Sequence, residues 1–237
     1  MDNQDFLKTI TASFNKFLTT GSRSNEKLKI LHGAIAKDIS SRLNNPDFTV
    51  LSLGYNNGKE GTISGRYLNK KVDITISKKQ KIIAGIGVKF VMQNYSQNSN
   101  NYFENMLGET ANIRSNKIPY FQIFIIPDTL PYYDEKQKIK KWEYFTKHNV
   151  EKYLNLSKDN IELSTHTPTK TLLFVIHIPD INRNILDKKD YISYYSNHKN
   201  LSLNISNNEY GEFSSSVILN DYEKFIEKII NYINFIQ

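Results

Sequence analysis

Two charged residues stand inside otherwise apolar stretches of this sequence, and they are the first candidates for chemistry. Asp73 lies in the stretch VDITI, and Lys89 lies in the stretch IGVKF. Side chains alternate between the two faces of a β-strand, so Asp73 and Lys89 share a face if the two stretches pair with their apolar side chains together. A lysine among apolar residues is costly unless it has a partner or a function. The two residues therefore form either a plain cross-strand ion pair or part of a catalytic site.

A carboxylate from the next helix can join these two residues. Glu104 lies 15 residues after Lys89, in a predicted helix over residues 101–114. Gly85 and Gly87 belong to the predicted Lys89 face of the strand and carry no side chains, which leaves room for a carboxylate from that helix. The two glycines therefore allow a carboxylate of this helix to approach Asp73 and Lys89.

The same helix offers a second carboxylate and a second explanation of the first. Glu109 lies about 140° round the helix from Glu104, so we expect only one of the two to face the sheet well. Asn101 can also be the N-cap of this helix, which would make Glu104 the N3 residue of a capping box. The sequence leaves these alternatives open.

The elements that must position these residues follow from the periodicity of the apolar side chains. Spacings of three and four residues predict helices over residues 2–20, 24–43, 101–114, 134–147 and 221–237. Apolar runs between turn residues predict strands over residues 48–54, 60–68, 71–77, 81–92, 120–126 and 171–179. A continuous apolar strand after a helix is typical of burial on both faces of a mixed sheet. We expect an α/β fold with a central mixed β-sheet flanked by helices.

A strand aspartate, a hairpin and a strand lysine, flanked by helices, resemble the PD-(D/E)XK nuclease superfamily, whose largest group is the type II restriction endonucleases. The resemblance covers about residues 60–126 and includes the block from Asn94 to Asn112. The chain departs from the family pattern at Gly87, where the family has Asp or Glu two residues before the lysine. A subgroup of the family takes its glutamate from the following helix at about the distance from the lysine that Glu104 has, so the resemblance favours Glu104 over Glu109.

The resemblance implies the chemistry of phosphodiester hydrolysis. Asp73 and Glu104, or Glu109 as the alternative, would bind Mg²⁺ or Mn²⁺, and the main-chain carbonyl of Val88 would complete the ligand set. Such an ion polarises the phosphate and lowers the pKa of a bound water. Lys89 would orient the attacking water and stabilise the developing charge. Oxygen ligands without His or Cys suit these ions better than zinc.

The resemblance also implies an organisation and a partner. We expect one nuclease domain over residues 1–237, with a restriction-endonuclease-like core at about 25–127 and an elaboration over 128–237 for recognition and dimerisation. The expected partner is double-stranded DNA, cut at a specific sequence by a homodimer. The first and the C-terminal helices are the best apolar candidates for the dimer interface. No nucleotide cofactor is expected, because the sequence has no GxxxxGK[ST] loop.

Polar residues at two places are candidates for DNA contacts, because Asn and Gln can read adenine, and Lys can read guanine or bind phosphate. The first group directly follows the lysine strand and comprises Gln93, Asn94, Tyr95, Gln97 and Asn98. The second group lies in the Asn- and Tyr-rich segment 191–210 and comprises Tyr194, Asn197, His198 and Lys199. Either group can instead be a solvated polar surface.

Two charged helix faces have the same ambiguity. Glu26 and His32 of the predicted helix over residues 24–43 either border the site, where they could contact metal or phosphate, or lie on a solvated face. The run from Lys136 to Lys141 either attracts phosphate or is a solvated face of a helix.

The composition narrows the class of protein. The chain has 237 residues, of which 39% are hydrophobic, and a net charge of +7, which fits a sizeable core and an anionic partner. The lack of cysteine excludes a thiol nucleophile and cysteine-bound metals. The sequence has no stretch typical of a membrane helix or a signal peptide, so we expect a cytoplasmic protein with no membrane partner. Two alternatives stay open: a catalytically inactive DNA-binding module on the same fold, and a repair- or phage-type nuclease without a fixed sequence.

Overall fold

The computed structural model describes residues 1–179, 181–182, 184–198 and 201–236. The helices are α1 (Asn3–Thr20), α2 (Glu26–Leu43), α3 (Tyr95–Arg114), α4 (Lys147–Ser157), α5 (Lys188–Ser196) and α6 (Tyr222–Phe235). The central sheet contains β1 (Phe48–Ser52), β4 (Ile74–Lys78), β5 (Lys81–Phe90), β6 (Tyr120–Pro127), β9 (Lys170–His177), β10 (Asn204–Ile205) and β11 (Val217–Leu219). Two separate hairpins are formed by β2 (Gly61–Ser64) with β3 (Asn69–Val72), and by β7 (Thr129–Tyr133) with β8 (Ile139–Tyr144).

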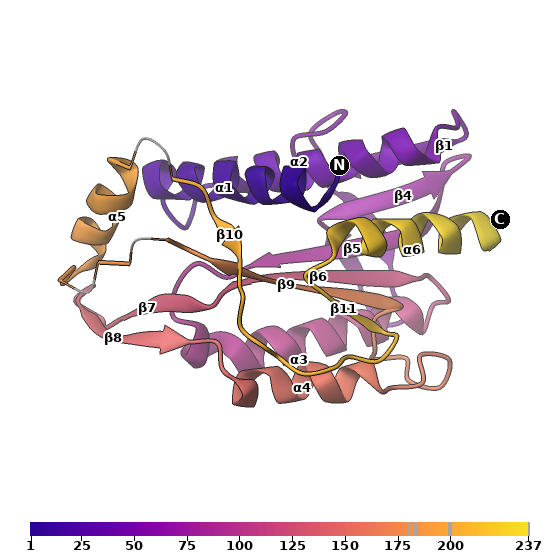
Figure 1. Ribbon diagram of the computed structural model, residues 1–237. Helices are drawn as coiled ribbons and strands as arrows, with labels where there is room; N and C mark the ends of the chain where they lie inside the picture. The colour runs from indigo at the N-terminus through magenta and orange to yellow at the C-terminus, as the bar shows by residue number, and fades with distance from the viewer. Residues whose placement is uncertain (180, 183, 199–200, 237) are drawn as a thin grey trace.

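The molecule has three layers, as Figure 1 shows: α1, α2 and α6 lie on one face of the central sheet, and α3 and α4 lie on the other. The strand order is β1-β4-β5-β6-β9-β10, and β11 also pairs with β9. β1, β4 and β5 are antiparallel neighbours, whereas β5, β6 and β9 run parallel. The predicted α/β class with a central mixed sheet between helices is confirmed.

β6 and β9 form the centre of the sheet and are buried on both faces. Along β6, Ile123 and Ile125 pack in the core beneath α1, α2 and α6, whereas Phe124 and Ile126 pack in the core beneath α3 and α4. This is the burial expected of parallel strands covered by helices on both sides. β9, β11 and α6 all follow residue 127, so the second half of the chain contributes to the same core as the first. In the described ranges, no helix is both long enough and apolar enough to cross a membrane.

The predicted strand over residues 71–77 is interrupted at Asp73. Val72 ends β3, which pairs with β2, whereas Ile74 begins β4, which pairs with β1 and β5. The two side chains therefore enter different core clusters and do not share a face, contrary to the alternation expected for one continuous strand. The hydroxyl of Ser52 donates a hydrogen bond to the carbonyl of Asp73 at 2.8 Å, which fixes the backbone at this junction. Asp73 thus lies where two sheets meet.

α3 begins at Tyr95, earlier than the predicted start at Asn101. The first turn is rich in Asn and Ser, which are poor helix formers, but tertiary contacts outweigh their intrinsic preference. The carboxylate of Glu143 on β8 accepts hydrogen bonds from the backbone N–H and the hydroxyl of Ser96, so it satisfies a free amide at the positive end of the helix. Glu104 is therefore in the middle of the helix, and the capping-box explanation is wrong.

The predicted helix over residues 134–147 is also wrong, because β7 and β8 form a hairpin here. Asp134 makes the turn: its Oδ1 accepts hydrogen bonds from the N–H groups of Lys136 and Lys138, both at 2.9 Å. Gln137 adopts a φ of 62°, in the left-handed region that a continuous helix does not allow. The lysine run consequently lies on a hairpin turn and along β8, not on one face of a helix.

The apolar faces of the first and last helices are buried inside the monomer. Phe6 of α1 stacks on Tyr222 of α6, with ring centroids 4.0 Å apart, and meets Phe174 of β9 edge-on at 5.0 Å. These two faces are used in the core, which leaves little of their apolar surface for the expected dimer interface.

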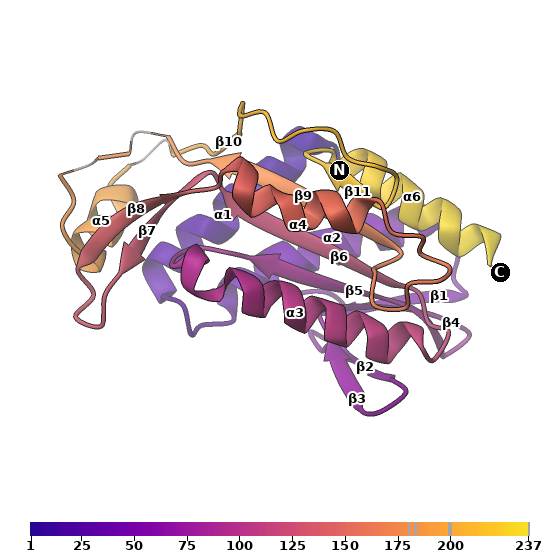
Figure 2. The same cartoon turned by 90° about the horizontal axis from the view of Figure 1, so that it is seen from below.

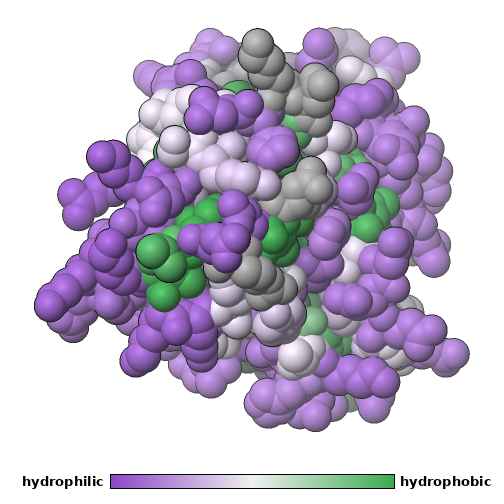
Figure 3. Space-filling view, turned by 60° about the vertical axis from the view of Figure 1, so that its left-hand side comes forward, coloured by the Kyte–Doolittle hydropathy of each residue, from purple (hydrophilic) through white to green (hydrophobic). Residues whose placement is uncertain are grey.

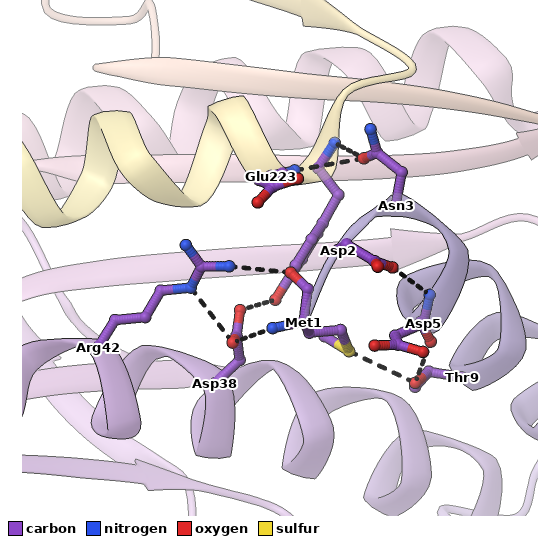
Figure 4. A network of polar contacts seen from close by, with 9 residues as sticks. Met1, Asp2, Asn3, Asp5, Thr9, Asp38, Arg42 and Glu223 are labelled. Carbon is purple, nitrogen blue, oxygen red and sulfur yellow. Dashed lines mark hydrogen bonds and ion pairs between the residues drawn. The ribbon is translucent and has the colours of Figure 1, made fainter.

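A buried carboxylate, Asp38 of α2, connects these helices (Figure 4). Its Oδ1 accepts hydrogen bonds from the Met1 ammonium at 2.6 Å and from Arg42 Nε at 3.2 Å. Its Oδ2 accepts one from the hydroxyl of Tyr222 at 3.0 Å. One side chain therefore satisfies donors from three parts of the chain.

Replacing Asp38 with alanine is expected to lower the free energy of unfolding by about 2–4 kcal/mol, because buried donors lose their charged acceptor. Denaturation by urea measures the change. Asp5→Ala is the matched control, since the Asp5 pair with Lys8 lies on the exposed surface of α1 and its loss should leave the unfolding midpoint almost unchanged. Equal shifts in the two variants would contradict the importance of the buried network.

Candidate functional site

A cavity of 640 Å³ contains the residues that the sequence singles out for chemistry. Asp73, Lys89, Glu104 and Glu109 all line it, so the structure brings the four together from the β3–β4 junction, β5 and α3. Figure 2 shows α3 lying along β5, with the β2–β3 hairpin projecting beside it. This arrangement puts two layers of the fold and one hairpin around a single opening.

The Asp73 carboxylate is largely enclosed, with 31% of its side chain exposed. Its Oδ2 accepts a hydrogen bond from the N–H of Val88 at 2.7 Å. Burial raises the pKa of Asp73 to about 6; the Val88 hydrogen bond and the positive charge of Lys89 oppose this rise, and the negative charge of Glu109 adds to it. The protein itself does not fully balance the negative charge of this carboxylate, and a bound cation would stabilise its ionised form.

The metal-free Asp73→Asn variant is expected to be more stable than the wild type at pH 8, by about 1–2 kcal/mol. Because the pKa of Asp73 rises from 3.8 to about 6 on folding, its ionised form destabilises the fold above pH 6, and this penalty disappears as the pH falls toward 3.8. The two proteins should therefore be almost equally stable at pH 4. Urea denaturation in EDTA measures both differences. Asp47→Asn, at a side chain that is 42% exposed, is the control and should bring no gain at pH 8.

Lys89 lies on the cavity side of β5, while its neighbours Val88 and Phe90 pack against the core on the opposite face. Its Nζ lies 4.0 Å from the centroid of the Tyr102 ring on α3, close enough for a cation–π contact. Burial lowers the pKa of Lys89, and the charge of Asp73 opposes this effect. Within the part of the chain that the structure describes, Lys89 forms no ion pair with Asp73. The plain ion-pair explanation is therefore wrong, and the ammonium can interact with an anion in the cavity.

Glu109 lies close to the position where the family pattern has an acid on the strand. The hydroxyl of Tyr120 donates a hydrogen bond to Glu109 Oε1 at 2.6 Å, and Lys70 Nζ lies 2.9 Å from Oε2. A Cβ atom at Gly87 would lie 2.3 Å from the same Tyr120 hydroxyl and 2.6 Å from Gln122 Oε1. No side chain fits at position 87 without moving these groups, and the carboxylate of Glu109 is held beside them.

Glu104 lines the same cavity but is exposed to solvent. Its charge acts on Lys152 of α4, where it opposes the lowering of the lysine pKa by burial. The pKa of Asp73, by contrast, responds to the charge of Glu109. We infer that Glu109 is the carboxylate of α3 that faces Asp73.

Asp73 also belongs to a second group of potential ligands, on its side toward α2. His32 of α2, Glu60 and Asp73 each offer one ligand atom, and these atoms lie within 4.8 Å of one another. Burial lowers the pKa of His32 to about 4, with the charge of Glu60 opposing it. His32 is 1% exposed, so it borders the site and does not lie on a solvated face. Glu26, the other candidate on α2, pairs with Lys29 at the surface.

Two glycines allow α2 to approach the site this closely. A Cβ atom at Gly33 would lie 2.7 Å from the carbonyl oxygen of Gly54, and one at Gly54 would lie 2.1 Å from the carbonyl oxygen of Lys29. α2 and the turn after β1 therefore pack backbone against backbone. This close packing brings His32 next to Asp73, although the two residues are 41 positions apart in the chain.

The first group of candidate DNA contacts has partly structural roles. Asn94 precedes α3 and exchanges two hydrogen bonds with the backbone of Tyr133, at 2.9 and 3.1 Å, which tie the helix to the β7–β8 hairpin. Tyr95 is buried and packs edge-on against Phe145, so it does not belong among the DNA contacts. The other members of the group keep part of their surface accessible: Gln93, Gln97 and Asn98.

The second group lies at the end of α5. The ring of Tyr194 packs edge-on against that of His198, with centroids 4.9 Å apart, and Asn197 is exposed at the C-cap of the helix. Lys199 lies outside the described residues. α5 and the β7–β8 hairpin occupy the same end of the molecule in Figure 1, and an ion pair of 2.8 Å between Lys138 and Asp187 joins them. Figure 3 shows that this end is mostly hydrophilic.

Several residues of the site were not among the sequence-based candidates: Glu60, Lys70, Tyr102, Tyr120 and Gln122. One of them had a signal in the sequence, because Gln122 interrupts the apolar run YFQIFII in the same way that Lys89 interrupts its own strand. Glu60, Lys70 and Tyr102 lie in polar or mixed segments, where nothing distinguishes them from solvated residues.

The cavity combines carboxylates, an ammonium group and aromatic walls in an opening that is accessible to solvent. Carboxylates bind divalent cations, and lysine binds phosphate oxygens, so this combination is suited to a metal ion together with a polyanion. Comparison of the chain with known protein families, with curated proteins and with solved structures finds no match.

Proposed function

We propose that this protein is a Mg²⁺-dependent endonuclease that hydrolyses phosphodiester bonds of double-stranded DNA at a specific sequence, in the manner of type II restriction enzymes. One observation carries the proposal: Tyr120 holds the Glu109 carboxylate beside the space that a side chain at Gly87 would fill. Together with Asp73 and Lys89, Glu109 supplies the two acids and the lysine that the resemblance to the nuclease superfamily requires.

The donor atoms fit a hard divalent cation. Asp73 and Glu109 would hold Mg²⁺, with Mn²⁺ as a substitute, and Val88 would add its main-chain carbonyl. The ion, when bound, neutralises phosphate charge and lowers the pKa of a water molecule. The raised pKa of Asp73 supports the fit, because a cation would remove the cost of the buried negative charge.

The protein's own side chains have distinct roles in this proposal. Lys89 donates hydrogen bonds to the attacking water and to the phosphate, and the Tyr102 ring keeps its ammonium inside the cavity. Lys70 balances the charge of Glu109 before a cation binds, through their contact of 2.9 Å. Tyr120 fixes the orientation of Glu109.

Incubation of plasmid and phage DNA with the purified protein, with Mg²⁺ or with EDTA, tests the proposal. Discrete fragments that form only with Mg²⁺ are expected, and sequencing their ends gives the recognition site. A smear of products would indicate a nuclease without a fixed sequence. Intact DNA with Mg²⁺ and also with Mn²⁺, combined with specific DNA binding, would indicate the catalytically inactive module.

Lysines of the β7–β8 hairpin are the proposed phosphate contacts outside the site. Lys136 and Lys140 line a second cavity together with Gln97, beside the start of α3. Replacing both lysines with alanine is expected to weaken DNA binding and to reduce the slope of log affinity against log salt by about 2, since each phosphate contact contributes about 0.9. Binding titrations between low and physiological salt measure the slope. The double variant K16A/K37A, on the helices of the opposite face, should keep the wild-type slope.

The remaining parts of the proposal are a homodimeric state and a cytoplasmic location. Cleavage of both strands at a palindromic site favours two copies of the chain related by a two-fold axis. Light scattering of the protein bound to a short site-containing duplex tests this expectation, with a protein mass twice 27.6 kDa as the expected result. A single copy on the duplex would contradict the dimer.

A further inference from the structure

His32, Glu60 and Asp73 meet on the side of Asp73 that faces α2. They come from α2, from the segment before β2 and from the β3–β4 junction. His32 and Glu60 do not line the 640 Å³ cavity, whereas Asp73 does. Asp73 therefore has one side toward the cavity and another toward α2, where its Oδ1 lies 3.8 Å from His32 Nδ1.

We propose that these three residues form a separate metal site for a first-row transition ion such as Mn²⁺. Their ligand atoms lie within 4.8 Å of one another. Two ligands with bonds of about 2.0–2.2 Å to one ion are at most about 4.4 Å apart, so only small side-chain movements are needed. The site needs no other element of the protein to move.

The absence of hydrogen bonds to the His32 imidazole is the second observation that indicates a ligand. His32 is 1% exposed, and neither of its ring nitrogens has a hydrogen-bond partner. Buried polar groups in proteins almost always have such a partner, and a metal ion would provide one. Imidazole also sets the class of ion, because it binds first-row transition metals well, whereas Mg²⁺ prefers oxygen ligands.

The two carboxylates favour Mn²⁺ within that class, because one nitrogen and two carboxylate ligands suit an ion that accepts both donor types. An ion here would join α2 to the segment before β2 and would neutralise the Asp73 carboxylate from the side that faces α2. This site shares Asp73 with the proposed nuclease centre, but binding of the ion does not depend on nuclease activity and is measured without DNA.

Titration of the metal-free protein with Mn²⁺ in a large excess of Mg²⁺, followed by the electron paramagnetic resonance signal of free Mn²⁺, tests the proposal. The wild type is expected to retain one Mn²⁺ despite the Mg²⁺. His32→Gln and Glu60→Gln should each weaken Mn²⁺ binding at least tenfold. His177→Gln is the matched control, since His177 also lies beside a carboxylate, Asp128 at 3.1 Å, and should leave binding unchanged.

Two further readouts make the outcome decisive. Co²⁺ bound to the wild type should show visible absorption bands that change in His32→Gln, because nitrogen coordination alters them. If the buried His32 variant fails to fold, Glu60→Gln decides, since Glu60 is only half-buried in a loop. Equal Mn²⁺ affinity in the wild type and Glu60→Gln, or complete displacement of Mn²⁺ by Mg²⁺, would overturn the proposal.

The failure of this inference can be distinguished from the failure of the proposed function. Binding of Mn²⁺ that requires His32, in a protein that cuts no DNA, would leave the metal site standing and refute the nuclease. If the protein cuts DNA and its Mn²⁺ affinity is the same in His32→Gln and Glu60→Gln as in the wild type, the metal site is refuted and the nuclease proposal is not.

Discussion

Replacing Lys89 with methionine is expected to reduce the rate of DNA cleavage by at least about 10³-fold, while affinity for DNA changes only a few-fold. The ammonium group is the only part of the side chain that this change removes, because methionine keeps a flexible apolar stem that can pack against Tyr102. Lys89 already gives up solvation to lie 4.0 Å from that ring, a cost that a role in the reaction explains. Single-turnover cleavage under saturating enzyme measures the chemical step.

Lys71→Met is the matched control for this loss. Lys71 is an exposed lysine of β3, close in sequence to Asp73, and does not line the cavity. Its removal lowers the net charge by the same amount but should leave the rate of the chemical step unchanged. A Lys89→Met protein that cleaves at the wild-type rate would remove Lys89 from the mechanism.

Glu109→Gln is expected to reduce cleavage by about 10²-fold or more, whereas Glu104→Gln should stay within a few-fold of the wild type. Both changes remove one negative charge from the same helix and the same cavity, so they form a matched pair. The difference arises because only Glu109 is held beside Asp73, by Tyr120 and Lys70, while Glu104 is exposed. Cleavage rates at several Mg²⁺ concentrations measure both the loss and the weaker metal binding behind it.

Rescue by the metal makes this prediction specific. A lost carboxylate ligand weakens the affinity for the ion, so part of the Glu109→Gln defect should be recovered at high Mg²⁺ or with Mn²⁺. Thermal unfolding of both variants checks that Glu109→Gln, which can still accept the Tyr120 hydrogen bond, keeps its fold. If Glu109→Gln cleaves at the normal rate and Glu104→Gln is inactive, Glu104 is the metal ligand, as the spacing in the sequence favours.

Periodicity is sufficient to predict the central sheet, its flanking helices and the β4–β5 hairpin, but not the β7–β8 hairpin. The continuous apolar run of β6 and the amphipathic faces of α1, α2 and α6 follow directly from the sequence, because burial dominates there. The β7–β8 hairpin and the first turns of α3 depend on contacts from distant residues, such as Glu143 with Ser96. Local preference cannot show such contacts, so the charged segment near Lys136 was predicted as a helix.

In the candidate site too, residues marked by their local sequence can be predicted, whereas those that depend on contacts with distant residues cannot. Asp73 and Lys89 can be selected from the sequence, because a charged side chain in an apolar stretch is costly unless it has a partner or a function. The sequence favours Glu104 over Glu109, whereas the structure points to Glu109, because the choice depends on where the Tyr120 hydroxyl lies in a neighbouring strand. His32 looked like part of an exposed helix face, and only the close packing of Gly33 against Gly54 explains its burial.

The stacking of Phe6 on Tyr222 has a consequence for how the chain is synthesised. α1 leaves the ribosome before α6, yet part of its apolar face packs against α6, which is made more than 200 residues later. Until then that part of the face stays uncovered, and contacts of such large sequence separation slow folding and expose chains to aggregation. Asp73, Lys89 and Glu109 are all translated by the midpoint of the chain. The core beneath them closes only after α6 has left the ribosome, so a chain that lacks α6 should be a substrate for chaperones and should have no nuclease activity.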